Sequence, residues 1–99
     1  MSMAAGLRLM YRAWRYRLRH DPLEIDLVRR MVRPGDLAID IGAHKGAYTY
    51  WMARGVGRSG RVIAFEPQPV LADRLRRSLA GLGLKQVTVE LAALSSHSG

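Results

Sequence analysis

The chain has 99 residues, of which 48% are hydrophobic and 24% are charged, so its composition is that of one small globular domain and not of a disordered segment. It contains no cysteine, which excludes disulfides and cysteine-ligated metal sites. Sixteen Lys and Arg against eight Asp and Glu give a net charge of +8, and no apolar run reaches the roughly 20 residues that cross a bilayer. We therefore expect a water-soluble, cytoplasmic protein.

Residues 1–20 form a basic segment without any acidic residue. Large apolar side chains recur there at helical spacing, and arginines follow the same period on a neighbouring face. The apolar set is Leu7, Met10, Tyr11, Trp14 and Leu18, and the basic set is Arg8, Arg12, Arg15 and Arg19. We predict a basic amphipathic helix over 1–20, apart from a domain at 21–99. The apolar face is expected to cover the body of the protein; the alternatives are contact with a membrane surface, nucleic-acid binding or a targeting role.

A second helix is expected directly after this segment. Asp21 suits the N-cap, Pro22 suits the first helical position, and Glu24 completes a capping-box pattern. The helix is expected to end before Pro34. Its inward face is predicted to consist of Leu23, Leu27, Val28 and Met31.

From residue 37 onward the pattern alternates between strands and helices. Short apolar runs at 37–41, 61–65 and 87–91 predict strands, the first of them buried on both faces. The segments 48–54 and 69–82 predict the helices between them. Strands that alternate with helices imply a parallel sheet with right-handed crossovers. The predicted fold class is α/β, the N-terminal half of a doubly wound, Rossmann-like sheet.

A candidate ligand site lies where the first predicted strand ends. The segment 40–46 has the spacing D-x-G-x-x-x-G, in which Gly42 and Gly46 permit a tight turn with backbone N–H groups facing a ligand. Glu66 ends the next strand, where a carboxylate can accept hydrogen bonds from ribose hydroxyls. After the third strand, Ala92-Ala93 offers small side chains beside which an adenine can lie.

Asp40 discriminates between two kinds of nucleotide ligand at this site. It stands where the G-x-G-x-x-G fingerprint of nicotinamide and flavin dinucleotides has its first glycine. A carboxylate there repels a pyrophosphate, but it attracts the ammonium group of a methionine-derived ligand. The dinucleotide is the alternative ligand, and the contrast favours S-adenosylmethionine.

Four segments in succession resemble the landmarks of FkbM-type methyltransferases, which are class I S-adenosylmethionine-dependent enzymes. They are Arg33-Pro34-Gly35-Asp36, the run from Asp40 to Thr49, Ala64-Phe65-Glu66-Pro67 and Ala93-Leu94-Ser95. The resemblance implies that the methionine part of the cofactor lies at Asp40, Gly42, Ala43 and Gly46. It also implies that Glu66 binds the ribose hydroxyls and that Pro67 and Gln68 border the adenine. Tyr48 begins the helix after the glycine turn, and this position makes it a candidate neighbour of the cofactor. His44-Lys45 departs from the family, which usually has Asn followed by an apolar residue there.

The resemblance further implies O-methylation of a small molecule or sugar hydroxyl. The family fold has about seven strands, of which this chain supplies the first three in the order 3-2-1, so we expect a truncated fragment. The first strand is then an open sheet edge, and we expect Asp40 to be more exposed than in the complete fold. Self-association or a partner chain can complete the sheet at this edge. The alternatives are a non-catalytic remnant that binds cofactor or partner, and a basic module that binds lipid or nucleic acid.

The remaining polar residues suggest no further site. The spacing of His20, His44 and His97 suggests no metal site. The terminal stretch 95–98 has serines and a histidine without the strained elbow of a nucleophile. We therefore expect no metal, and the sequence indicates no catalytic residue.

Overall fold

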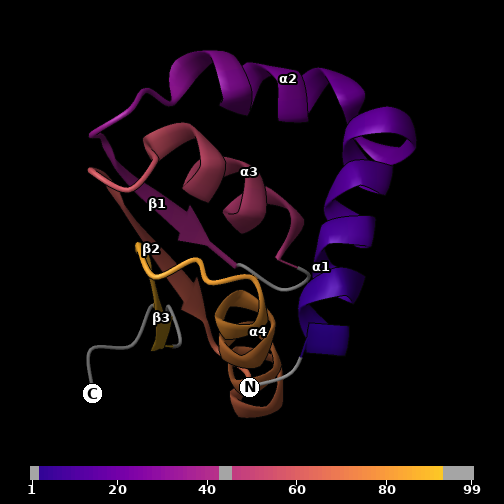
Figure 1. Cartoon of the computed structure of the whole chain (residues 1–99), viewed down its shortest axis with the longest axis vertical. Helices are drawn as coiled ribbons and strands as arrows, with labels where there is room; N and C mark the ends of the chain where they lie inside the picture. The colour runs from indigo at the N-terminus through magenta and orange to yellow at the C-terminus, as the bar shows by residue number, and fades with distance from the viewer. Residues whose placement is uncertain (1–2, 43–45, 93–99) are drawn as a thin grey trace, which may run out of the picture.

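The computed structural model describes residues 3–42 and 46–92, and its helices and strands alternate as the sequence predicts (Figure 1). The elements are α1 (Met3–Arg15), the π-helical segment η1 (Tyr16–His20), α2 (Pro22–Met31), β1 (Leu37–Ile41), α3 (Ala47–Val56), β2 (Arg61–Glu66), α4 (Pro69–Gly81) and β3 (Val87–Leu91). Within these described ranges, no helix is long and apolar enough to cross a membrane.

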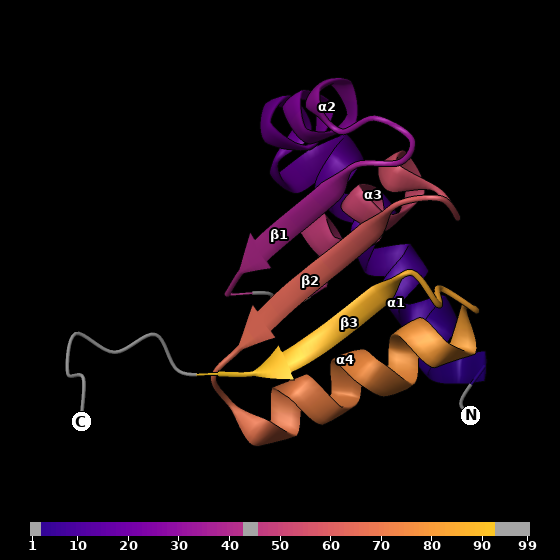
Figure 2. The same cartoon turned by 90° about the vertical axis from the view of Figure 1, so that its left-hand side faces the viewer.

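The three strands form one parallel sheet in the order β1-β2-β3, which confirms the predicted order 3-2-1. Ala38 of β1 lies opposite Val62 of β2, and Val62 lies opposite Val87 of β3. All three strands run in the same direction, so their carboxyl ends meet at one edge of the sheet (Figure 2). Ligands of doubly wound folds bind at this edge.

The helices that the structure describes cover only one face of the sheet. Helices α3 and α4 pack on that face, and α1 lies across both of them on the outside (Figures 1 and 2). On the opposite face, Leu37, Ile39 and Ile41 of β1 are 62%, 52% and 63% exposed. The prediction that this strand is buried on both faces is therefore wrong, because the elements that the structure describes supply a single helical layer.

Helix α1 docks through a different face from the one that the sequence predicts. Its buried residues are Gly6, Leu9 and Ala13, whereas Leu7 and Tyr11 are more than half exposed. A Cβ at Gly6 would lie 3.0–3.2 Å from atoms of 81–82, so glycine lets α1 approach the end of α4 closely. The small residues decide the orientation because they allow two helices to come together, and hydrophobicity alone does not detect this.

The buried face of α1 is tied to α3 through an indole. Trp51 of α3 is 3% exposed, and its Nε1–H donates to the carbonyl of Ala13 at 2.9 Å. The ring of Trp14 meets the Trp51 ring edge-on, with 5.0 Å between centroids. The Arg17 guanidinium lies 4.8 Å from the Trp14 centroid and 5.0 Å from that of Trp51. These contacts fix the junction of α1 and η1 on α3.

Helix α2 has the predicted bounds but not the predicted cap, and its predicted inward face is confirmed only in part, by Val28, which packs against a core cluster. Asp21 occupies the N-cap position and Pro22 begins the helix, yet the Asp21 side chain caps no backbone N–H. Ile25 is the buried residue of the helix, while Leu23 is 86% exposed. The capping-box prediction is wrong because the carboxylates of Asp21 and Glu24 instead accept hydrogen bonds from a side chain of α3.

Candidate functional site at the strand ends

Two buried carboxylates lie at neighbouring strand ends on the same face of the sheet. Asp40 is opposite Ala64 in the register of β1 and β2, and Glu66 follows Ala64 by two residues. Side chains two residues apart in a strand share a face, so both carboxylates point toward the helical layer. The structure therefore brings together the two acids on which the sequence-based site depends.

Asp40 is held by α3. It is 9% exposed, and its Oδ2 accepts a hydrogen bond from Thr49 Oγ1 at 2.5 Å. Burial raises the pKa of the Asp40 carboxyl above its usual 3.8, and the Thr49 bond offsets part of this rise. Although β1 is an open strand edge, the Asp40 side chain is buried, because it turns inward beneath α3.

Gly42 and Gly46 bound the turn that joins β1 to α3. Gly42 has φ +75° and Gly46 has φ +76°, a left-handed conformation that glycine adopts without strain. A Cβ at Gly42 would meet nothing within 4 Å, whereas one at Gly46 would lie 2.8 Å from Cδ1 of both Leu9 and Leu75. The turn is thus open at its start and closely packed at its end. Ala43, His44 and Lys45 lie outside the described residues.

Glu66 closes β2 with its side chain turned toward its own following backbone. It is 2% exposed, and its Oε2 accepts a hydrogen bond from the backbone N–H of Gln68 at 2.9 Å. Pro67 and Gln68 are exposed beside it. The N–H of Ala92 donates to the Glu66 carbonyl at 3.3 Å, so the end of β3 lies next to this acid. Ala93 lies outside the described part of the chain.

Tyr48 begins α3 near the turn, but its hydroxyl is directed to α2. The hydroxyl lies 3.1 Å from both Asp21 Oδ2 and Glu24 Oε2, and these two acceptors share its single proton. Burial and these two carboxylates raise the Tyr48 pKa above its ordinary value of 10, since they disfavour a phenolate. The structure therefore does not place the Tyr48 hydroxyl with the two site carboxylates.

The chain thus has a glycine-bounded turn after β1 and a carboxylate near the end of each of two neighbouring parallel strands. A comparison with known families agrees with this arrangement. The family model described as "Methyltransferase FkbM domain" matches residues 40–98. The chain belongs to the FkbM methyltransferase domain family.

Curated relatives of this FkbM-domain chain are methyltransferases with different printed acceptors. A protein-L-isoaspartate O-methyltransferase from Ignicoccus hospitalis is 40% identical over 58 residues, or 59% of this chain and 28% of that protein. A ribosomal RNA large subunit methyltransferase E from Acidithiobacillus ferrooxidans is 36% identical over 59 residues, or 60% of this chain and 27% of that protein. The chain thus spans less than a third of the length of these relatives.

Solved structures show the same fold. A SAM-dependent O-methyltransferase from Thermotoga maritima matches with a TM-score of 0.66 and 33% identity, over 73% of this chain and 28% of that one. A SAM-dependent methyltransferase from Aquifex aeolicus matches with a TM-score of 0.69 and 24% identity, over 94% of this chain and 48% of that one. The FkbM-domain chain therefore has part of the Rossmann-like methyltransferase fold.

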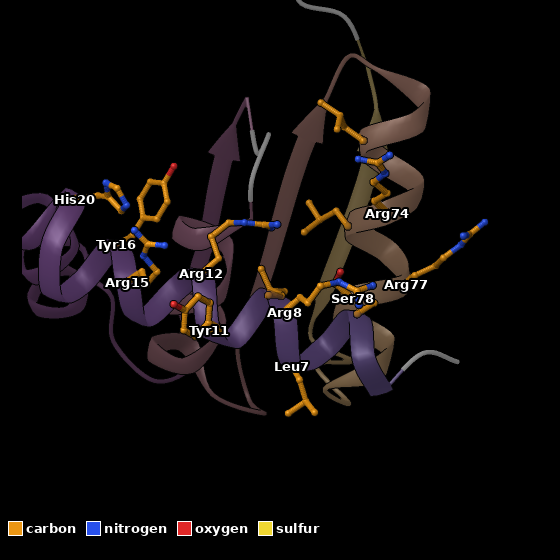
Figure 3. A pocket seen from close by; sticks show the side chains of 14 residues that line it. Leu7, Arg8, Tyr11, Arg12, Arg15, Tyr16, His20, Arg74, Arg77 and Ser78 are labelled. Atoms are coloured by element: carbon orange, nitrogen blue, oxygen red, sulfur yellow. The ribbon is translucent and has the colours of Figure 1, made fainter.

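Sequence reasoning missed two features of this FkbM-domain chain. The first is Thr49, whose hydroxyl donates to Asp40. The sequence does contain a signal for it, because Thr49 is a hydroxyl residue in the first turn of the helix that follows the strand with Asp40 near its end. The second feature is a groove between α1 and α4, to which both helices contribute arginines (Figure 3). Periodicity shows which residues share a helix face, but it does not show that two basic faces meet. Among the described residues, no group of three His, Asp or Glu side chains is arranged to hold a metal ion.

Proposed function

We propose that this chain is the cofactor-binding half of an S-adenosylmethionine-dependent methyltransferase whose acceptor is a hydroxyl oxygen of a small molecule or sugar. The observation that carries the proposal is the pair of inward-facing carboxylates, Asp40 and Glu66, on either side of the glycine turn at the strand ends. Curated relatives act on a protein and on ribosomal RNA by their printed names, so the hydroxyl acceptor rests on the FkbM resemblance alone.

The residues present fit this cofactor better than a dinucleotide. Next to the open start of the turn, the Asp40 carboxylate favours a cationic ammonium group and disfavours a pyrophosphate. Gly42 supplies the left-handed backbone there and leaves space in the direction of its absent Cβ. The methionine part is assigned to these two residues together with Ala43 and Gly46.

The second acid is assigned to the sugar of the cofactor. Glu66 has one carboxylate oxygen engaged by the Gln68 N–H, which orients the group at the end of β2. A carboxylate in this position accepts hydrogen bonds from both hydroxyls of a ribose. The adenine is assigned to the exposed Pro67 and Gln68, and Tyr48 is retained as a neighbour of the cofactor through its position at the start of α3.

The bound cofactor supplies an electrophilic methyl group on its sulfonium. What the described residues contribute is orientation, because a methyl transfer requires the acceptor oxygen to lie in line with that carbon. Asp40 is positioned for this by Thr49, and the end of the turn is braced by Leu9 and Leu75.

We further propose a cytoplasmic location and completion of the sheet through the open edge of β1, by self-association or by a partner chain. Strand β1 pairs only with β2 among the described strands, which leaves one side of its backbone available for hydrogen bonds.

Isothermal titration of the full chain with S-adenosylhomocysteine tests the proposal. Glu66→Gln should weaken binding by roughly 10–100-fold, because a hydrogen bond to a charged group contributes about 1.5–3 kcal/mol. Glu90→Gln is the matched control: it makes the same change in the same sheet, at an exposed position opposite Phe65 on the bare face.

Three results would contradict the proposal. The first is a folded, monodisperse sample that gives no heat of binding with S-adenosylhomocysteine. The second is an equal loss of affinity in Glu66→Gln and Glu90→Gln. The third is tighter binding of NADH than of S-adenosylhomocysteine. Binding without methyl transfer to any supplied hydroxyl compound would instead identify a non-catalytic remnant.

A further inference from the structure

One side of the α1–η1 segment is an exposed apolar stripe. It begins at Met3, which is 76% exposed, and its side chains recur every three or four residues, so they share one side of the helix. We define this apolar stripe as Met3, Leu7, Tyr11, Trp14 and Leu18. Trp14 is the least exposed member, because its ring also meets Trp51. The buried side of α1 is occupied by other residues, so apart from this contact of Trp14 the stripe is exposed on the described body.

A basic stripe runs alongside the apolar one. It comprises Arg8, Arg12 and Arg15, and it lines the groove whose far wall is α4 with Arg74 and Arg77 (Figure 3). No Asp or Glu is among the residues that line this groove in the part of the chain that the structure describes. On the exposed surface of α4, Asp73 Oδ2 accepts from Arg77 Nη2 at 2.8 Å. The groove is therefore a site of concentrated positive charge.

We propose that the α1–η1 segment docks on the surface of an anionic lipid membrane. A helix with adjoining apolar and basic stripes lies in the plane of the interface, where its apolar side chains enter the acyl boundary and its cations meet lipid phosphates. The apolar stripe thus matches the acyl layer of the membrane surface, and the basic stripe matches its layer of phosphates. This role goes beyond the proposed methyl transfer, and it assigns a function to the exposed side of α1 and η1.

The apolar stripe decides between a membrane and a nucleic acid. The arginines of the groove suit the phosphates of either ligand, since each pairs with guanidinium groups. A nucleic-acid backbone would leave the aliphatic side chains of Met3, Leu7 and Leu18 in water. A bilayer interface removes the same side chains from water, at a gain of roughly 25 cal/mol per Å² of apolar surface.

Vesicle flotation of the full chain tests the docking. The vesicles contain phosphatidylcholine alone, or phosphatidylcholine and phosphatidylglycerol in equal parts. We expect binding to the anionic vesicles to fall roughly 30-fold in Arg8→Gln/Arg15→Gln, since each arginine near an anionic surface contributes about 1 kcal/mol. The matched control is Arg33→Gln/Arg58→Gln, which removes the same charge from exposed positions outside α1 and should leave binding unchanged.

The apolar stripe has its own pair of variants. Leu7→Ser/Leu18→Ser should weaken binding at least about tenfold, because two exposed leucines lose their burial in the interface. The control is Leu37→Ser/Val70→Ser, which removes two comparably exposed aliphatic side chains from the sheet and α4. Because the chain has no cysteine, an environment-sensitive dye on Leu18→Cys provides a second measurement. Its emission should shift to the blue on anionic vesicles, while the same dye on Val70→Cys should not respond.

Several results would overturn the proposal. Equal binding to both kinds of vesicle would remove the role of the anionic lipid, and unchanged binding in Leu7→Ser/Leu18→Ser would remove that of the apolar stripe. Retention of single-stranded RNA with the same arginine dependence, and without vesicle binding, would identify the groove as a nucleic-acid site. Concentration-dependent dimers lost in the leucine variant, without vesicle binding, would identify a second copy of the chain as the occupant.

Discussion

Truncation of Leu9 tests which face of α1 holds the helix to the protein. Leu9 is 1% exposed and belongs to a core cluster with Ala64 of β2 and with Leu75 and Leu79 of α4. Leu→Ala changes at such positions cost about 2–5 kcal/mol, since they remove buried methyl groups and leave a cavity. Leu7 is two residues away on the same helix but is 55% exposed, so Leu7→Ala should change stability by less than about 0.5 kcal/mol.

This difference is large for a chain of this size. The free energy of unfolding of a small domain is roughly 5–15 kcal/mol, so Leu9→Ala should remove a substantial part of it. We expect the melting temperature to fall by about 10 °C or more, since 1 kcal/mol corresponds to roughly 4–8 °C in a domain of 60–100 residues. Urea unfolding followed by far-ultraviolet circular dichroism measures both variants. A loss in Leu7→Ala as large as that in Leu9→Ala would show that α1 docks through its predicted face, and it would refute the orientation described above.

Three further changes test the site. Gly46→Ala should destabilise the chain by about 2–4 kcal/mol, because it adds overlap with two leucines to the strain of a left-handed backbone. Gly83→Ala is the control for the strain without overlap, since Gly83 has φ +68° after the end of α4 and nothing near its Cβ. Equal losses of the two variants in urea unfolding would exclude the overlap. Tyr48→Phe should cost about 0.5–1 kcal/mol through loss of the hydrogen bonds to the start of α2, and an unchanged melting curve would show that these bonds contribute nothing. Burial raises the pKa of the Asp40 carboxyl above 3.8, so the folded chain binds the carboxyl proton more tightly than the unfolded chain does. The contribution of Asp40 to the free energy of unfolding therefore falls as pH rises from 3.8 through the raised pKa. Asp40→Asn should therefore gain stability relative to the parent over that range, and a pH-independent difference between the two proteins would contradict the shift.

The strands and the turn could be predicted from the sequence because their signals are local. The apolar run at 37–41 ends in a glycine-bounded turn, and Glu66-Pro67 ends the next run, so the two acids are assigned to strand ends without knowledge of the packing. Parallel strands then bring those ends to one edge. The FkbM resemblance adds the identity of the ligand, which local patterns alone leave open between two kinds of nucleotide.

The orientations of the helices could not be predicted because they depend on partners distant in sequence. On α1 a stripe led by Leu7 and Tyr11 is more apolar than the face that is buried, yet Gly6 and Ala13 permit the closer approach. On α2 the same reasoning selected Leu23, whereas the buried residue is Ile25. In both helices the most hydrophobic stripe faces solvent, a pattern that also motivates the membrane proposal.

The packing of α1 against α4 has a consequence for the order in which the chain acquires its structure during synthesis. Leu9 leaves the ribosome well before its partners Leu75 and Leu79, which lie in α4. At about 5–20 residues per second, the helix spends several seconds without the surface that buries it. Its final contacts close a long loop, at an entropic cost that grows only slowly with loop length. The nascent helix therefore exposes Leu9 together with its outer stripe until α4 has been synthesised.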